Sequence, residues 1–377
     1  MTIVVYTSGH GFGHASRDIE VLDTIARKRP GAQIVVRTSV RRWFFDISVR
    51  APIDLQPAHV DSGVVQIDSL HLDQDDTARE AARFYADFDR RVADEADVLS
   101  HIDASAVVGD VPPLAFAAAR RANIPSIALS NFTWDWIYGA YPQFERLAPG
   151  VLAVIRDAYA CATRALRLPL SGGFEPMAAV TRAVPLVARR SRRGRVQTRR
   201  ALALEDQGPI VLASFGAYGA TLPYEDIARD APFTLLVTDH EMGGGSAAGG
   251  RLRRYTGETL AALGIRYEDL VAAADVVVTK PGYGIVSECV ANGAALLYTS
   301  RGRFAEYDVL VAEMPRVLRC RYVPQDDLRA GRWAEAVTAV LGQPPPPVTL
   351  DTNGAEVVAD PSHRRSPAEK LRTQPTR

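Results

Sequence analysis

Short apolar runs alternate with amphipathic segments along the first half of the chain. Runs rich in β-branched residues predict buried parallel strands at 2–7, 33–38, 106–109 and 125–129. Between them the pattern predicts helices at 15–29, 76–100 and 114–122; in the first, Ile19, Leu22 and Ile25 recur on one face. Strands that alternate with helices are typical of a parallel sheet with helices on both faces.

The same alternation restarts in the second half. Strands are predicted at 210–214, 234–238, 275–279 and 295–299, and helices at 285–292 and 306–314. Between the halves the pattern dissolves, and seven arginines lie between residues 189 and 200. This basic run suits a phosphate or nucleic-acid patch, but a solvated linker is favoured because the net charge of the chain is zero.

The predicted fold class is therefore α/β, with two Rossmann-like, doubly wound parallel-sheet domains that face a cleft. Four segments are expected: an N-terminal domain at 1–168, a linker at 169–205, a C-terminal domain at 206–342 and a disordered tail at 343–377. Ligands of such sheets bind beyond the carboxyl ends of the strands.

Composition narrows the class of protein. A chain of 377 residues is long enough for two cores, and a net charge of zero implies no general attraction to nucleic acid. Three scattered cysteines and the lack of a signal peptide or an 18-residue apolar run predict a cytoplasmic protein without a transmembrane segment. A peripheral membrane contact stays open through the basic and aromatic residues at 41–45, although a buried helix is the favoured use of this segment.

The stretch from Lys280 to Glu288 predicts an anion site. A β-branched strand leads into a Gly-Pro-Gly turn and a helix, which places unpaired backbone N–H groups and the positive end of a helix dipole at one point. Lys280 adds a point charge for a diphosphate, and Glu288 lies where a carboxylate can accept hydrogen bonds from a diol. The binding residues predicted here are Lys280, Gly282, Tyr283, Gly284, Ser287 and Glu288.

The loop after the first strand carries candidate catalytic groups. Its glycines do not match the dinucleotide fingerprint, because the third glycine comes one position early and the second strand ends without an acidic residue. Gly11 and Gly13 allow a ligand to approach closely, beside His10 and His14. A histidine at a strand end suits a general base for a hydroxyl nucleophile, whereas capping and packing are its structural alternatives.

Other strand ends supply further candidates. Asp110 ends a neighbouring strand, where it either orients one of the histidines, binds acceptor hydroxyls or caps the next helix. Gly216 and Gly219 form a turn suited to a phosphate, and Glu306 either reads sugar hydroxyls or begins its helix. The aromatic residues at 132–136 suit either a sugar platform or the core.

Four motifs, in order, resemble a known family. The segments 9–15, 110–112, 131–138 and 280–288 resemble the glycosyltransferase-like N-terminal region of plant L-arabinokinase. Residues 269–297 are similar to the donor-binding half of GT-B glycosyltransferases, notably the type that adds N-acetylglucosamine to lipid I. Together the matches cover roughly residues 1–340, and the glycine-rich ATP loop of a sugar kinase is not expected in the remaining residues 341–377.

The resemblance implies a GT-B glycosyltransferase that moves a hexosyl or pentosyl group from a nucleotide-diphosphate sugar to an acceptor hydroxyl. In this interpretation Glu288 contacts the ribose, the turns at Gly216 and Gly282 face the phosphates, and His14 or His10 is the base. No metal and no cofactor are expected, the nucleotide sugar being a co-substrate. Two alternatives remain: a non-catalytic sugar or sugar-nucleotide binding module, and a sugar-nucleotide 2-epimerase.

Overall fold

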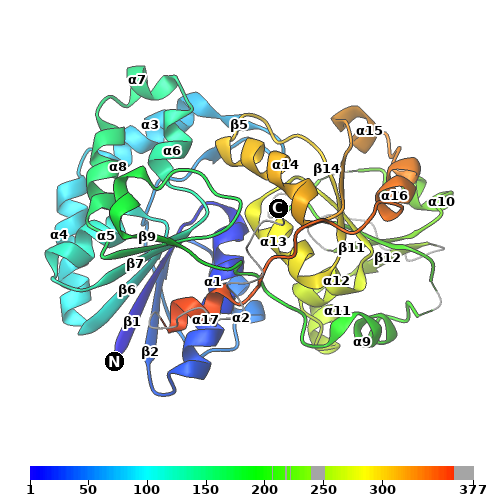
Figure 1. Cartoon of the computed structure of the whole chain (residues 1–377), viewed down its shortest axis with the longest axis horizontal. Helices are drawn as coiled ribbons and strands as arrows, with labels where there is room; N and C mark the ends of the chain where they lie inside the picture. The colour runs from blue at the N-terminus through cyan, green and yellow to red at the C-terminus, as the bar shows by residue number, and fades with distance from the viewer. Residues whose placement is uncertain (206, 217–218, 221, 239–250, 361–377) are drawn as a thin grey trace, which may run out of the picture.

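Two parallel sheets form the two halves of the protein, as seen in a computed structural model that describes residues 1–205, 207–216, 219–220, 222–238 and 251–360 (Figure 1). The first sheet has seven strands in the order β3-β2-β1-β6-β7-β8-β9, and the second has six in the order β12-β11-β10-β13-β14-β15. Every pair of neighbouring strands in both sheets is parallel. The α/β prediction is therefore confirmed.

The strands of the first sheet are β1 (Thr2–Thr7), β2 (Gln33–Thr38), β3 (Asp54–Pro57), β6 (Ala104–Asp110), β7 (Ser126–Ser130), β8 (Arg164–Arg167) and β9 (Thr181–Ala183). A small hairpin of β4 (Val65–Gln66) and β5 (Leu72–Asp73) lies outside it. The helices of this half are α1 (Gly11–Lys28), α2 (Arg42–Ser48), α3 (Gln74–Tyr85), α4 (Phe88–His101), α5 (Pro113–Arg121), α6 (Trp134–Gly139), α7 (Gln143–Leu147) and α8 (Val151–Ala160), with a 3₁₀ turn η1 (Glu175–Val180).

The second sheet contains β10 (Ile210–Ala213), β11 (Thr234–Thr238), β12 (Leu252–Tyr255), β13 (Val276–Thr279), β14 (Ala295–Tyr298) and β15 (Cys320–Tyr322). Its helices are α9 (Gly194–Ala201), α10 (Tyr224–Arg229), α11 (Gly257–Ala262), α12 (Tyr267–Ala273), α13 (Tyr283–Asn292), α14 (Ala305–Val317), α15 (Gln325–Arg329) and α16 (Ala334–Leu341). The central strands β10 and β13 are buried along their whole length, as expected for a sheet covered on both faces.

The predicted helices differ from the structure in their bounds, and three of the differences concern where a helix begins or breaks. The helix predicted from residue 15 begins at Gly11, and the helix predicted from residue 285 begins at Tyr283. The single helix predicted at 76–100 is two helices, α3 and α4, with a break at residues 86–87. No glycine or proline marks this break, and the aromatic rings of Tyr85 and Phe88 pack together across it.

The prediction of a disordered tail from residue 343 is wrong for residues 343–360. After α16 the chain crosses back to the first half and forms a short helix, α17 (Gly354–Ala359), which packs on α1 (Figure 1). The packing buries Val357 and Val358 to 7% and 3% exposure, and Glu356 pairs with Arg27 and Lys28. The apolar residues of α17 lie within a polar and proline-rich stretch of sequence, so the pattern did not indicate a helix there. Residues 361–377 lie outside the described residues.

Gly354 is the tightest point of this returning segment, and its replacement supplies a test. A Cβ atom at Gly354 would collide with the carbonyl oxygen of Pro185 and crowd the side chain of Val187. Gly354→Ala should therefore destabilise the protein by about 1–3 kcal/mol through overpacking, and should free the tail for proteolysis. Limited proteolysis beside a urea titration measures both. Equal cleavage of the tail in the variant and the wild type would contradict this packing.

The two halves contact each other closely in this structure. Helix α1 packs against α13, and a Cβ atom at Gly284 would lie 3.2 Å from Cα of Gly13. The Ser69 hydroxyl of the β4–β5 hairpin donates to the carbonyl of Gly219 at 2.6 Å, across the same junction. The carboxyl ends of β1 and β13 thus meet between the two sheets.

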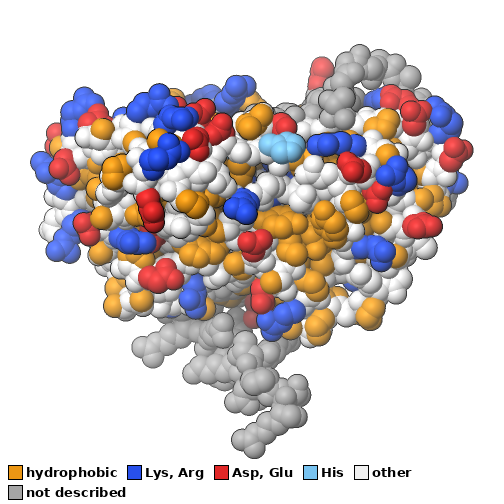
Figure 2. Space-filling view, turned by 90° about the horizontal axis from the view of Figure 1, so that it is seen from above, with side chains coloured by type: hydrophobic (Ala, Val, Ile, Leu, Met, Phe, Trp, Pro, Cys, Tyr) orange, Lys and Arg blue, Asp and Glu red, His pale blue; other side chains and the backbone are white. Residues whose placement is uncertain are grey.

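The surface carries no dominant charge. Seen from above, basic and acidic side chains are interspersed over both halves, in keeping with the zero net charge (Figure 2). Several arginines of the basic run pair within the fold instead of facing solvent: Arg189 bonds Glu288, and Arg195 and Arg199 bond Asp275. Within the described part of the chain, no helix combines the length and apolar character needed to span a membrane.

Candidate active site

His14 and Asp110 form a buried pair between the first two central strands. His14 lies in the first turn of α1, directly after β1, and Asp110 is the last residue of β6, which is the neighbour of β1. His14 Nδ1 lies 2.8 Å from Asp110 Oδ1, and the two residues are 5% and 0% exposed. The predicted orientation of a histidine by Asp110 is present in this geometry.

Arg17 holds the Asp110 carboxylate in its ionised form. Its Nε and Nη2 groups bond the two oxygens of Asp110, and Nη1 donates to Asn131 Oδ1 at 2.6 Å. Burial alone would raise the pKa of Asp110, but the charge of Arg17 and the hydrogen bonds from Arg17 and His14 outweigh it and lower this pKa to about 2. Asp110 is therefore a charged hydrogen-bond acceptor at neutral pH.

The tautomer of His14 follows from the donors around it. Arg17 Nη2 also lies 2.9 Å from His14 Nδ1. However, Nη2 carries only two hydrogens, and these are donated to Asp110 Oδ1 and Ser130 Oγ. The proton on Nδ1 of His14 is then the one that bonds Asp110, and in the neutral ring this tautomer leaves Nε2 as an acceptor. Such a nitrogen is suited to remove a proton from a hydroxyl group.

His10 has the opposite hydrogen-bonding pattern. The backbone N–H of Val64 donates to its Nδ1 at 3.3 Å, so that the proton of the neutral ring lies on Nε2. Burial, followed by the charges of Arg301 and Lys280, lowers the pKa of His10 well below its usual range. His10 is thus a neutral hydrogen-bond donor, a role that differs from the base considered in the sequence.

Asp18 is a buried acid next to this cluster, and it supplies a second test. Thr7 Oγ1 donates to its Oδ2 at 2.5 Å, whereas Oδ1 lacks a partner among the described residues. Burial and the nearby Asp110 carboxylate raise the pKa of Asp18 well above its ordinary 3.8. The folded protein therefore keeps a proton that the unfolded chain loses, and this group destabilises the fold as the pH rises above the ordinary pKa.

Replacing Asp18 with asparagine removes that titration. Asp18→Asn should increase the free energy of unfolding at about pH 7 relative to the wild type, and by less at about pH 3, where the wild-type acid is mostly neutral in both states. Urea titrations at the two pH values measure the difference. A change in stability that is the same at both values would mean that Asp18 is ionised in the folded protein.

The turn before α13 faces this cluster from the second half. Gly282 precedes the helix without a side-chain cap, and Arg301 donates to the carbonyl of Pro281 at 3.2 Å. Tyr283 lies beneath the guanidinium of Arg17, which is 5.1 Å from the centre of its ring. The uncapped N–H groups of the first turn and the nearby cations make this corner electropositive.

Two predicted acidic residues are already paired in the structure. Glu288 is 2% exposed and accepts a 2.7 Å hydrogen bond from Arg189, so its carboxylate is not presented to the junction between the halves. Glu306 lies in the first turn of α14, and its Oε1 accepts from Asn131 Nδ2 at 2.8 Å. Glu306 therefore ties the second half to the cluster around Arg17.

The remaining candidates are placed as follows. Gly11 and Gly216 have φ angles of +68° and +81°, which glycine adopts without strain. Gly219 donates to the carbonyl of Gly216 at 3.0 Å, while residues 217–218 of this predicted phosphate turn lie outside the described residues. The Ser287 hydroxyl bonds the carbonyl of Gly284 within α13, so it is used inside the helix.

The aromatic residues after β7 do not form an exposed platform as a group. Phe132 and Trp134 are 2% and 0% exposed, and Trp134 packs against the rings of both His10 and His14. Only Trp136 of this group is half-buried. The core interpretation of Phe132 and Trp134 is therefore the correct one.

Sequence reasoning missed Arg17 and Asn131. Arg17 stands three residues after His14 on α1, a spacing that places both on one helix face. That spacing was a usable signal, although an arginine in an amphipathic helix is usually solvated. Among the described residues, no group of three or more His, Cys, Asp or Glu side chains is arranged to hold a metal ion.

Comparisons with known proteins agree on the architecture. No protein-family model matches the chain. The chain is 27% identical over 375 residues to L-arabinokinase from Arabidopsis thaliana, a match that covers 95% of this chain but only 34% of that relative. The chain thus spans about a third of the length of the relative.

Solved glycosyltransferases share the arrangement of both sheets. The glycotransferase of kitacinnamycin matches with a TM-score of 0.58 and 16% identity, over 91% of each chain. Glycosyltransferase VinC in complex with dTDP matches with a TM-score of 0.55 and 14% identity, over 91% of this chain and 92% of VinC. The two parallel sheets and these likenesses show that the chain has the GT-B fold, the architecture of nucleotide-sugar glycosyltransferases.

Proposed function

We propose that the protein is a GT-B glycosyltransferase that moves a sugar from a nucleoside-diphosphate sugar to an acceptor hydroxyl. The observation that supports this most is the position of the His14–Asp110 pair. His14 lies on α1 next to Gly13, and a Cβ atom on Gly284 at the beginning of α13 would lie 3.2 Å from Cα of Gly13. A base from one half and an anion-binding helix end from the other half therefore meet at one point.

The proposed step uses these groups in sequence. The acceptor hydroxyl attacks the anomeric carbon of the donor sugar, and its proton passes to Nε2 of His14. The new C–O bond forms as the bond from the anomeric carbon to the phosphate oxygen breaks, and the nucleoside diphosphate leaves. Asp110 stabilises the resulting imidazolium, which Arg17 keeps correctly oriented through Asp110.

The leaving diphosphate is the group that most needs stabilisation. We assign this role to the N–H groups at the beginning of α13, to Lys280 and to the turn at Gly216 and Gly219, because fixed dipoles that face developing negative charge contribute most in such sites. The cations Lys280 and Arg301 and the helix dipole supply positive charge without a metal ion. Transfer should therefore persist in the presence of a chelator.

Donor entry requires the two halves to part. Gly13 and Gly284 are in van der Waals contact, and Ser69 bonds Gly219 across the same junction. These contacts describe a closed arrangement, and a diphosphate fits between the loops only after they separate. A contact between Glu288 and the ribose also requires the Glu288 carboxylate to turn away from Arg189 and toward the junction.

The donor base is inferred from a structural neighbour. VinC was solved with dTDP, and we propose that this chain takes a nucleoside diphosphate of the same size, either dTDP or UDP. The acceptor is bound by the first half, where His14 lies. L-arabinokinase is a kinase by name, but the chain matches only a third of it, so a transfer activity does not conflict with that match.

A panel of nucleotide sugars tests the proposal. A ligand that binds only the folded protein should add about 2.7 kcal/mol of stability at a hundred times its Kd, which a thermal-shift screen detects. Donors that bind are then incubated with and without hydroxylated acceptors, and the products are separated. Release of the diphosphate together with a new glycoside supports the transferase. A changed donor sugar would indicate an epimerase, and binding without any product would indicate a binding module.

A further inference from the structure

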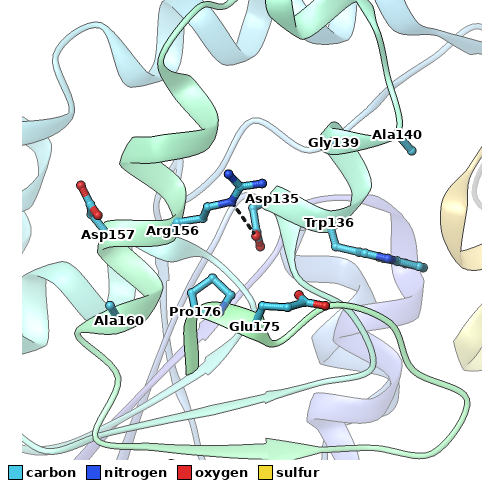
Figure 3. A pocket seen from close by; sticks show the side chains of 9 residues that line it. All are labelled: Asp135, Trp136, Gly139, Ala140, Arg156, Asp157, Ala160, Glu175 and Pro176. Carbon is cyan, nitrogen blue, oxygen red and sulfur yellow. Dashed lines mark hydrogen bonds and ion pairs between the residues drawn. The ribbon is translucent and has the colours of Figure 1, made fainter. Parts of the chain in front are cut away.

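A pocket of about 710 Å³ opens on the first half of the protein, outside the site described above (Figure 3). Its walls come from helix α6, helix α8 and the 3₁₀ turn η1. The volume falls within the range of small-molecule sites, which is roughly 300–1,000 Å³. Helix α6 separates the pocket from the histidines: Trp134 packs on both histidine rings, whereas Asp135 and Trp136 line the pocket.

Asp135 brings an unused hydrogen-bond acceptor to this pocket. The residue is 3% exposed, and its Oδ2 accepts from Arg156 Nε at 3.3 Å across the pocket (Figure 3). Its other oxygen, Oδ1, is buried and has no partner among the described residues. A buried carboxylate oxygen without a donor is unfavourable, and because Oδ1 has almost no accessible surface, a ligand hydroxyl bonds it only when the Asp135 side chain turns toward the pocket.

Trp136 adds an apolar wall to the polar one. Its indole extends from α6 along the pocket and packs against Gly172, where a Cβ atom would collide with the ring (Figure 3). This packing fixes the orientation of the indole, which remains half-buried. An immobile aromatic face beside polar acceptors matches a ring that has an apolar face and hydroxyl groups along its edge.

The charges of the pocket exclude an anionic occupant. The acidic residues Asp135, Asp157 and Glu175 line it, against the single basic residue Arg156. Negatively charged ligands, including phosphates, are therefore repelled. Asp135 and Arg156 are both planar groups able to bond two neighbouring hydroxyl groups at once.

We propose that this pocket binds a neutral sugar ring, which stacks on Trp136 and donates a hydroxyl hydrogen bond to the Asp135 carboxylate. The assignment does not depend on sugar transfer at His14, because the binding is measured with free sugars and without a nucleotide. Where transfer does occur, the pocket places a second sugar unit next to the helix that packs on the two histidines.

Ligand-observed NMR with methyl glycosides tests this assignment. Methyl glucoside, galactoside, arabinoside and N-acetylglucosaminide are titrated against the full chain, and we expect at least one Kd on the order of 1 mM. Trp136→Ala should weaken this binding by about tenfold, whereas Trp136→Phe should retain most of it. Asp135→Asn keeps the shape of the side chain but changes its hydrogen bonding, and should weaken the same sugar.

Controls separate sugar binding from general damage. Tyr322→Ala removes a half-exposed aromatic ring from the second half and should leave sugar binding unchanged. Thermal unfolding confirms that each variant is folded, and dTDP or UDP binding should be unaffected in all of them. Three results would overturn the proposal: no glycoside binds, Trp136→Ala binds as the wild type does, or glucosamine binds more tightly than every neutral sugar, which would make the pocket a cation site.

Discussion

Replacing His14 with alanine should lower the rate of sugar transfer by about 10² to 10⁴-fold, the range attributed to a positioned general base. The reason is geometric: the Nδ1 proton of His14 is engaged by Asp110 at 2.8 Å, which leaves Nε2 as the basic nitrogen of the site. The donor contacts α13 and Lys280 in this account, so its Kd should change by less than about twofold. Single-turnover kinetics and donor titration measure the two quantities separately.

His10 provides the matched comparison for this variant. Its Nδ1 accepts from Val64, and its proton therefore lies on the nitrogen that a base would need free. His10→Ala should slow transfer less than His14→Ala does. Its effect on donor binding is measured separately. If His10→Ala abolishes transfer and His14→Ala does not, the two roles are reversed. If His14→Ala instead removes donor binding, His14 is a donor-binding or structural residue.

Replacing Arg17 with methionine should lower the free energy of unfolding by about 3–5 kcal/mol, the loss typical of a broken buried ion pair. Methionine fills much of the same volume but leaves the Asp110 carboxylate, which is fully buried, without its guanidinium partner. The pKa of Asp110 should rise, because the charge that outweighs its burial is gone. Urea denaturation at neutral pH measures the loss.

A double variant checks that the loss arises from this pair. Asp110→Asn combined with Arg17→Met removes both charges, and it should be more stable than the sum of the two single losses implies. Additive losses would show that Arg17 stabilises the fold through its other contacts, to Asn131 and Ser130. The wild type should also lose stability as the pH falls from about 4 toward 2, because the folded pKa of Asp110 lies below the unfolded one.

Much of the fold was predictable because its strands are buried on both faces. A sheet covered by helices requires continuous apolar runs, and 2–7, 33–38 and 234–238 were identified with the bounds that the structure has. The helix break at residues 86–87 and the helix α17 were not predictable. The break at residues 86–87 contains neither glycine nor proline. Helix α17 is stabilised by its packing on α1 rather than by its own sequence.

Only those residues of the candidate site that lie next to glycines at the ends of strands were predictable from the sequence. The positions of His10, His14 and Asp110 follow from the rule that loops at the carboxyl ends of adjacent parallel strands meet. Side-chain pairing does not follow from that rule. The bond from Arg189 to Glu288 joins residues 99 positions apart, and the bond from Asn131 to Glu306 joins residues 175 apart, so no local pattern could reveal either.

The central claim is that a nucleoside diphosphate binds between the two halves, at the beginning of α13. Titration of the ¹⁵N-labelled protein with UDP or dTDP tests it most directly, by following the backbone amide signals. The account predicts that the largest shifts occur at Gly282, Tyr283 and Gly284, together with Gly13 across the junction. Saturable binding with shifts elsewhere and none at these amides would contradict it.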